Sequence, residues 1–166
     1  MYWIRFIILI LAGTIIQNNL ISLIAVTKAD IQPDLLLVLM TFFALFSRTE
    51  DAIISSFFIG FIADLTGLSV GPQMIGFGIT GSVIAEMRHL LALKRIPHQM
   101  ALTFTAGLVS SGIAMVLYPI KGYPSSEPLQ TALLWQPLYS AVLCPFIFFP
   151  TALIMKMSHN MVNNKW

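Results

Sequence analysis

The sequence predicts an all-α fold: a polytopic integral membrane bundle of about six transmembrane helices, forming one domain over residues 1–166. Two observations lead to this prediction. Of the 166 residues, 57% are hydrophobic and only 10% are charged, whereas an ordinary soluble domain is about 25% charged. The charged residues also fall in clusters between long apolar runs, as expected of a chain that crosses a bilayer repeatedly.

The first three apolar segments are 3–26, 33–47 and 52–66. The first is long enough to span a membrane, which takes roughly 20 apolar residues. The second and third are shorter, and we expect Pro33 at the N-terminal end of the second. They are separated by a charged segment, 48–51, which cannot rest unpaired in hydrocarbon and therefore favours a helical hairpin. If the two arms form a re-entrant pair, the number of spans is five.

The remaining segments are 71–88, 99–118 and 133–155. The first follows a glycine-rich turn, and the second follows the most basic stretch of the chain. The third is interrupted by prolines, including Pro145 and Pro150, and follows a proline-rich loop at 119–131. Each is expected as a transmembrane span.

The distribution of basic residues predicts the orientation. With the N-terminus in the cytoplasm, seven of the nine Lys and Arg residues fall in cytoplasmic segments, and only Lys28 and Lys121 fall outside. This bias is the one expected of a multi-pass protein with both termini in the cytoplasm. A cleaved signal peptide is disfavoured because the apolar character of the first segment continues to Val26.

No catalytic or metal-binding pattern is found in the sequence. The three histidines, His89, His98 and His159, lack the spacing of a metal site, and there is no phosphate-binding loop or nucleophile elbow. Cys144 lies in an apolar run and is interpreted as a small hydrophobic residue. A net charge of +2 gives no reason to expect a nucleic-acid partner. We therefore expect no enzymatic activity, no metal and no cofactor.

Polar residues within the apolar segments are the candidate structural sites. Asp34 is expected to cap a helix, Asp64 lies among glycines where helices must approach closely, and Glu86 is expected to pair locally near Arg88. The consecutive amides Gln17, Asn18 and Asn19 are expected either to form hydrogen bonds between helices or to line a polar interior.

Small residues recur at helical spacing in three of the segments. Such faces allow the backbones of membrane helices to approach closely. Packing within one compact bundle accounts for most of them, and a homodimer seam cannot be separated from it. The residues are Ser56, Gly60, Ala63 and Gly67, then Gly71, Gly78, Ser82 and Ala85, then Ala106, Ser110 and Ala114.

Short motifs in the middle and at the end of the chain resemble those of MreD, a bacterial rod shape-determining membrane protein family. The first is Pro33-Asp34-Leu35-Leu36-Leu37-Val38, and the second runs from Gly60 through Asp64 to Gly67, followed by Gly71 and Gly76. The last is the segment from Pro145 to Pro150. The likeness extends over nearly the whole chain, although the amides at 17–19 and the loop at 125–127 depart from it.

This resemblance implies a non-enzymatic scaffold of the cell-wall elongation complex in the bacterial inner membrane, needed for rod shape and organised peptidoglycan synthesis. The implied partners are a single-span MreC-like protein, the actin-like MreB, a peptidoglycan glycosyltransferase and a transpeptidase, together with membrane lipid. The resemblance also implies a fold similar to the substrate-binding subunits of vitamin importers. A small-molecule capture subunit is therefore the alternative. Such subunits use an Ala-x-x-x-Ala face, and Ala25 and Ala29 have that spacing.

Overall fold

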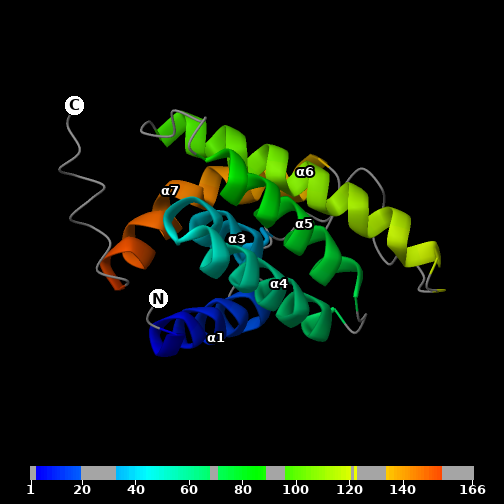
Figure 1. Ribbon diagram of the computed structural model, residues 1–166, viewed down its shortest axis with the longest axis horizontal. Coiled ribbons are helices and arrows are strands. Elements are labelled where there is room, and N and C mark those ends of the chain that lie inside the picture. Colours follow the sequence, from blue (N-terminus) through cyan, green and yellow to red (C-terminus); the bar gives the residue numbers. More distant parts are fainter. Residues whose placement is uncertain are drawn as a thin grey trace.

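The computed structural model describes residues 3–19, 33–67, 71–88, 96–120, 122 and 134–154. Within these residues every regular element is a helix, which confirms the all-helical prediction for this part of the chain. The helices are α1 (Trp3–Asn19), α3 (Leu35–Phe46), α4 (Thr49–Thr66), α5 (Pro72–Met87), α6 (Ile96–Ile120) and α7 (Gln136–Ile154) (Figure 1).

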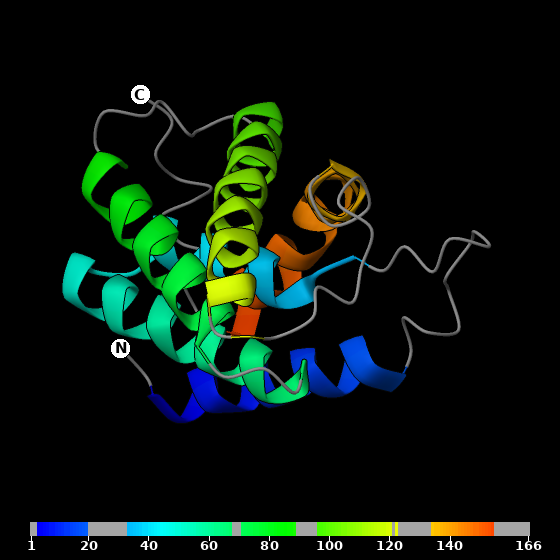
Figure 2. The ribbon, with the colours of Figure 1, turned by 90° about the vertical axis from the view of Figure 1, so that its right-hand side faces the viewer.

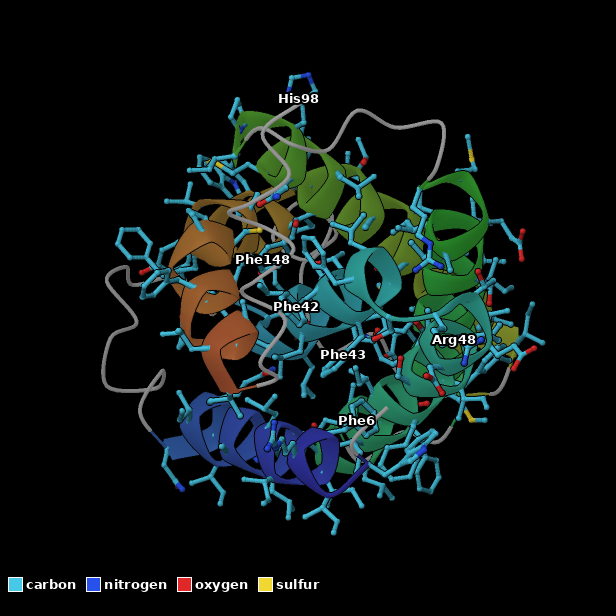
Figure 3. All side chains as sticks on the ribbon, turned by 60° about the vertical axis from the view of Figure 1, so that its left-hand side comes forward. Phe6, Phe42, Phe43, Arg48, His98 and Phe148 are labelled. Atoms are coloured by element: carbon cyan, nitrogen blue, oxygen red, sulfur yellow. The ribbon has the colours of Figure 1, made fainter. Side chains whose placement is uncertain are left out.

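Helix α3 lies at the centre and the other described helices surround it (Figures 2 and 3). Eleven of its twelve residues are buried. Its sequence, LLLVLMTFFALF, is apolar on every side apart from one threonine, the composition expected of a helix enclosed by protein. The short second arm predicted from the sequence is thus the core of the bundle.

Aromatic rings connect the centre of the bundle to two of the surrounding helices. Phe43 of α3 meets Phe6 of α1 edge to face, with ring centroids 4.9 Å apart. On the other side, Phe42 meets Phe148 of α7 at 5.3 Å. Figure 3 shows these four side chains gathered in the middle of the bundle. Such pairs contribute roughly 0.5–1.5 kcal/mol beyond the burial of their area.

Helices that follow one another in the chain run in opposite directions, and so do α3 and α6. Along α6, Gly107 faces Leu37 and Thr103 faces Thr41 of α3, so residue numbers rise in one helix as they fall in the other. In α1 and α3, Gly13 lies next to Leu39 and Gln17 next to Leu36, again in opposite order. In α4 and α5, Gly60 lies next to Met74 and Phe57 next to Gly78. In α6 and α7, Gly107 lies next to Pro137 and Thr103 next to Cys144. The N-termini of α3, α5 and α7 therefore share one end of the bundle.

We call the end that holds the N-termini of α3, α5 and α7 the cap end, and the opposite end the arginine end. Three Lys or Arg residues lie in the part of the chain that the structure describes, namely Arg5, Arg48 and Arg88, and all belong to the arginine end. Arg48 and His98 are exposed and point outward there (Figure 3). This is the distribution that the positive-inside rule associates with a cytoplasmic face.

The predicted hairpin between the second and third segments is present, but its turn is shorter than expected. Only Ser47 and Arg48 separate the two helices, because α4 begins at Thr49. Glu50 and Asp51 are therefore in the first turn of α4 rather than in the loop. Negative charges are favourable there because they meet the positive end of the helix dipole.

Two of the six predicted spans meet the length and composition of a transmembrane helix. These are α6, with 25 residues, and α7, with 19. Helices α1 and α3 are apolar but shorter. The prediction of a first span over 3–26 is described only as far as Asn19, and residues 20–32 lie outside the described part. The observed α6 is longer than the predicted 99–118, and it places Pro97 in its first turn, where the missing N–H of proline costs nothing.

Glycines allow the helices around α3 to approach closely. A Cβ atom added to Gly107 of α6 would lie 2.6 Å from Cβ of Pro137 and 2.8 Å from Cδ2 of Leu37. At Gly81 of α5 an added Cβ would collide with the side chain of Ser56 in α4. Gly112, in contrast, has no atom within 4 Å of such a Cβ, although it lies on the same helix as Gly107.

These two glycines of α6 give a matched test of the packing. Gly107→Ala should lower the free energy of unfolding by about 1–3 kcal/mol, because the added methyl group overpacks a contact among three helices. Gly112→Ala should be neutral or stabilising by up to about 1 kcal/mol, since alanine favours helix and the space is open. Thermal unfolding of both purified variants in detergent is the measurement. Equal stability of the two would contradict the described contact.

Candidate functional site

Asp64, in the last turn of α4, forms a cap on the N-terminus of α5. Its side chain is fully buried. Its Oδ2 accepts hydrogen bonds from the backbone N–H groups of Gly71 and Met74 at 2.7 and 2.9 Å, and Oδ1 accepts one from Gln73 at 2.9 Å. The first N–H groups of a helix have no partner inside the helix. One carboxylate of α4 therefore satisfies three such groups of α5, an arrangement we call the Asp64 cap.

The residues around Asp64 allow the two helices to meet at this point. Gly71 has a φ of 116°, which side chains other than glycine rarely permit. Pro72 follows as the first helical residue, where no N–H is required. In α4, a Cβ on Gly60 would lie 2.7 Å from both the carbonyl oxygen of Gln73 and Cα of Met74. The structure thus brings Gly60, Asp64 and Gly71 together in a single contact.

Gly76 and Gly67, which the sequence also singled out, do not take part in the contact among Gly60, Asp64 and Gly71. Gly76, one turn further along α5, faces α6, and its added Cβ would lie 2.8 Å from the carbonyl oxygen of Ser110. Gly67 is exposed and ends α4, where its N–H donates to the carbonyl of Ala63. Gly76 therefore serves the α5–α6 contact, whereas Gly67 terminates a helix.

Asp34 forms a second cap at the same end, on the central helix. Its Oδ1 accepts a hydrogen bond from the N–H of Leu37 at 3.0 Å, and its own N–H donates to Oγ of Ser140 in α7 at 2.8 Å. The N–H of Leu36 donates to Oε1 of Gln17 in α1 at 3.3 Å. We call this arrangement the Asp34 cap. It joins α1, α3 and α7 through the first turn of α3, directly after the buried Pro33.

The three consecutive amides of α1 do not act as a group. Gln17 is half-buried and forms the hydrogen bond to α3, whereas Asn18 and Asn19 are exposed. A helix rotates by about 100° per residue, so consecutive side chains point in different directions. Gln17 forms a hydrogen bond to the first turn of α3.

The arginine end is held by hydrogen bonds that the sequence did not reveal. The guanidinium of Arg88, at the end of α5, donates to the carbonyl oxygen of Ser47 and, at 3.2 Å, to Oγ1 of Thr49. Arg5 of α1 donates to the carbonyl oxygen of Ile154 at 3.3 Å. Carbonyl groups at helix C-termini lack partners within the helix, and cationic side chains satisfy them. Glu86, expected to pair near Arg88, is exposed.

A short chain of polar groups crosses the interior between the two ends. Oγ1 of Thr103 in α6 lies 3.4 Å from Oγ1 of Thr41 in α3 and 3.3 Å from Sγ of Cys144 in α7. Thr41 donates to the carbonyl of Val38, and the single hydroxyl hydrogen of Thr103 serves either the carbonyl of Gln99 or Sγ of Cys144. The neighbouring Pro145 is half-buried, and Pro150, one turn and a half along α7, is exposed.

The chemistry of these groups is that of helix packing. Asp34 and Asp64 both accept hydrogen bonds from backbone N–H groups at helix starts. Within the described residues no three His, Cys, Asp or Glu side chains gather in a way that could hold a metal ion. The candidate site is therefore a pair of structural caps at one end of the bundle.

Comparison with known proteins gives one match. The profile of the family described as rod shape-determining protein MreD matches residues 1–158, which is nearly the whole chain. No curated protein and no solved structure gives a significant match.

Substitutions at Asp64 test the three-donor cap. Asp64→Asn keeps one acceptor oxygen and should leave at least one of the three N–H groups without a partner, whereas Asp64→Leu leaves all three. Since each unsatisfied buried donor costs about 1–3 kcal/mol, we expect the order of stability to be wild type, then Asn, then Leu. Melting temperatures in detergent measure this order. Glu86→Gln, at an exposed position of α5, is the control and should melt like the wild type.

Equal losses in the two Asp64 variants would contradict the cap as described. That result would mean that the negative charge, and not the number of accepted hydrogen bonds, is what the position requires.

Proposed function

The chain belongs to the MreD family, and from that premise we propose that it is a non-enzymatic membrane subunit that organises peptidoglycan synthesis in the rod complex. The family membership itself gives it a role in rod-shape determination. The match over residues 1–158 is the observation that carries the proposal, because it covers both caps and all the described helices.

The arrangement of the helices is consistent with a scaffold rather than a catalyst. The polar side chains at both ends of the bundle bind backbone groups of neighbouring helices, which makes the contacts between helices specific. The outside carries large exposed apolar residues such as Phe146 and Phe149. Such surfaces suit lipid or the apolar faces of other membrane helices.

The partners that we propose are the other members of the rod complex. They are an MreC-like single-span protein, the actin-like MreB, and the glycosyltransferase and transpeptidase that build peptidoglycan. The outward surface of the described helices carries many large apolar side chains. We therefore propose that contact with the MreC-like partner is made by helix packing within the bilayer. No observation favours the alternative of a vitamin-type importer subunit.

We further propose that the protein crosses the bacterial inner membrane six times, with both termini in the cytoplasm. The membrane character of the family, the two apolar helices α6 and α7, and the alternating direction of the described helices support this topology. The three arginines at one end of the bundle support the assignment of that end to the cytoplasm.

A reporter enzyme that is active only outside the cytoplasm tests this topology. Fusions in the segments that contain Lys28 and Lys121 should be active, because both connect to the cap end. A fusion after Arg95 should be inactive, because the segment that contains it connects the end of α5 to the start of α6, and both of these lie at the arginine end. Activity of the Arg95 fusion together with inactivity at Lys28 would reverse the orientation.

Depletion of the protein in its rod-shaped host tests the function. Cells should become round and wide while peptidoglycan synthesis continues in a disorganised pattern, since the enzymes remain but their organisation is lost. Fluorescent labelling of new wall material is the measurement, and complementation by the wild-type chain is the control. Normal rods whose growth now depends on an added nutrient would contradict the proposal and favour an importer.

A further inference from the structure

Helix α7 is bent, and it carries two prolines in its interior, Pro145 and Pro150. Proline has no backbone N–H, so the carbonyl groups of Ala141 and Phe146, four residues earlier, lose the N–H groups that would normally bind them in a helix. Figures 1 and 3 show that α7 (orange to red) changes direction along its length and that its last turns approach α1 (blue). Sharp bends of helices commonly occur at proline. Two hydrogen bonds of the helix are therefore missing within one and a half turns of the bend.

The part of α7 before Pro145 is attached to the bundle through polar groups. Oγ of Ser140 accepts a hydrogen bond from the N–H of Asp34 at 2.8 Å. Cys144 is fully buried, and its Sγ lies 3.3 Å from Oγ1 of Thr103 in α6. This part of α7 is thus attached to the Asp34 cap and to α6.

The part of α7 that follows its first interior proline is held differently, by aromatic contacts and by its last carbonyl group. The ring of Phe148 is buried, and its centroid lies 5.3 Å from that of Phe42 and 6.0 Å from that of Phe46. At the end of the helix, Nη1 of Arg5 in α1 donates to the carbonyl oxygen of Ile154 at 3.3 Å, in an exposed position. Water or lipid headgroups can replace an exposed hydrogen bond at the arginine end, so these contacts are easier to separate than the buried ones at the cap end.

The missing hydrogen bonds lie where the attached part of α7 meets the part that is easier to separate. Bending at this point changes few backbone hydrogen bonds, because those of Ala141 and Phe146 are already absent. A packed aromatic ring is either in contact with its neighbours or out of contact, which favours two discrete positions over a continuous range.

We propose that the segment from Pro145 to Pro150 is a hinge, about which the C-terminal part of α7 moves between two positions. In the closed position, which the structure shows, Phe148 lies against Phe42 and Ile154 meets Arg5. In the open position these contacts are broken, α7 and α1 separate at the arginine end, and the cap end is unchanged. This inference does not depend on the proposed role in wall synthesis.

Distances between two spin labels on the full chain in lipid nanodiscs test the hinge. One label is placed either beyond the prolines, at Leu153→Cys, or before them, at Val142→Cys, and the other at Ile54→Cys in α4. All three side chains are about half exposed, and Cys144→Ser removes the single native cysteine. The Leu153 pair should give two distances, whereas the Val142 pair should give a single narrow distribution.

Restoring the two missing N–H groups should abolish the second distance. Pro145→Ala combined with Pro150→Ala should give one narrow distribution for the Leu153 pair, since both hydrogen bonds of the helix can form again. Pro97→Ala is the matched control, because Pro97 is exposed in the first turn of α6, where no N–H is required. It should leave both distances and their proportions unchanged.

A third variant tests the contact that holds the closed position. Phe148→Leu should raise the ratio of open to closed molecules roughly two- to ten-fold, the effect expected from loss of an aromatic pair. Phe149→Leu, at the exposed neighbouring position, is its control and should not change the ratio.

Each other outcome overturns the proposal. A single narrow distribution for the Leu153 pair in the otherwise unchanged chain would exclude the hinge, and this comparison needs no proline variant. Two distances for the Val142 pair as well would mean that α7 moves as a whole. A second distance that persists in the double proline variant would assign the motion to fraying of the helix end, and an unchanged ratio in Phe148→Leu would mean that this ring does not hold the closed position.

Discussion

The structure depends on satisfying the first backbone N–H groups of helices that begin where water is scarce. In hydrocarbon or in a protein interior, each such group without a partner costs several kcal/mol. Two aspartates solve this problem for α5 and for the central α3. The acceptor for the N-terminus of α5 is a side chain of α4, so this cap is also a contact between two helices. It places the start of α5 next to the end of α4.

The caps in turn require close approach of backbones, which explains where the glycines lie. Gly60 admits the first turn of α5, Gly76 admits the backbone of α6, and Gly107 admits Pro137 and the side chain of Leu37. Each is a point at which a methyl group would separate two helices. At the cap end side chains accept hydrogen bonds, whereas at the arginine end they donate them. There Arg88 and Arg5 donate to carbonyl groups at or just after the C-termini of helices. Hydrogen bonds at the two ends and close packing between them together define the register of the bundle.

The all-helical fold could be predicted from the sequence, whereas the contacts between helices could be predicted only in part. Each described helix overlaps an apolar segment of the sequence, and the predicted turn at 48–51 was too long because acids are favourable within the first turn of a helix. That α3 is central could not be derived, since in a membrane protein apolar residues face both lipid and protein. The partners of the Asp34 cap were also missed: Ser140 lies 106 residues from Asp34, and no periodicity links positions so far apart. The hydrogen bonds of Arg88 were also missed, because neither a charge count nor its neighbour Glu86 shows which carbonyl the guanidinium meets.

Because an apolar residue of a membrane protein can face either lipid or protein, its exposure does not identify what lies next to it. An exposed leucine or isoleucine in a membrane helix is expected next to lipid and identifies no partner. A polar group at membrane depth does identify a contact, because it needs a hydrogen-bond partner. In this chain Gln17, Asp34 and Asp64 find theirs within the bundle, and each lies where two helices meet. Asn18 lies beside Gln17 in sequence but on the outward side of α1. The buried and half-buried polar groups of the described bundle therefore identify where its helices meet, whereas its exposed apolar residues do not.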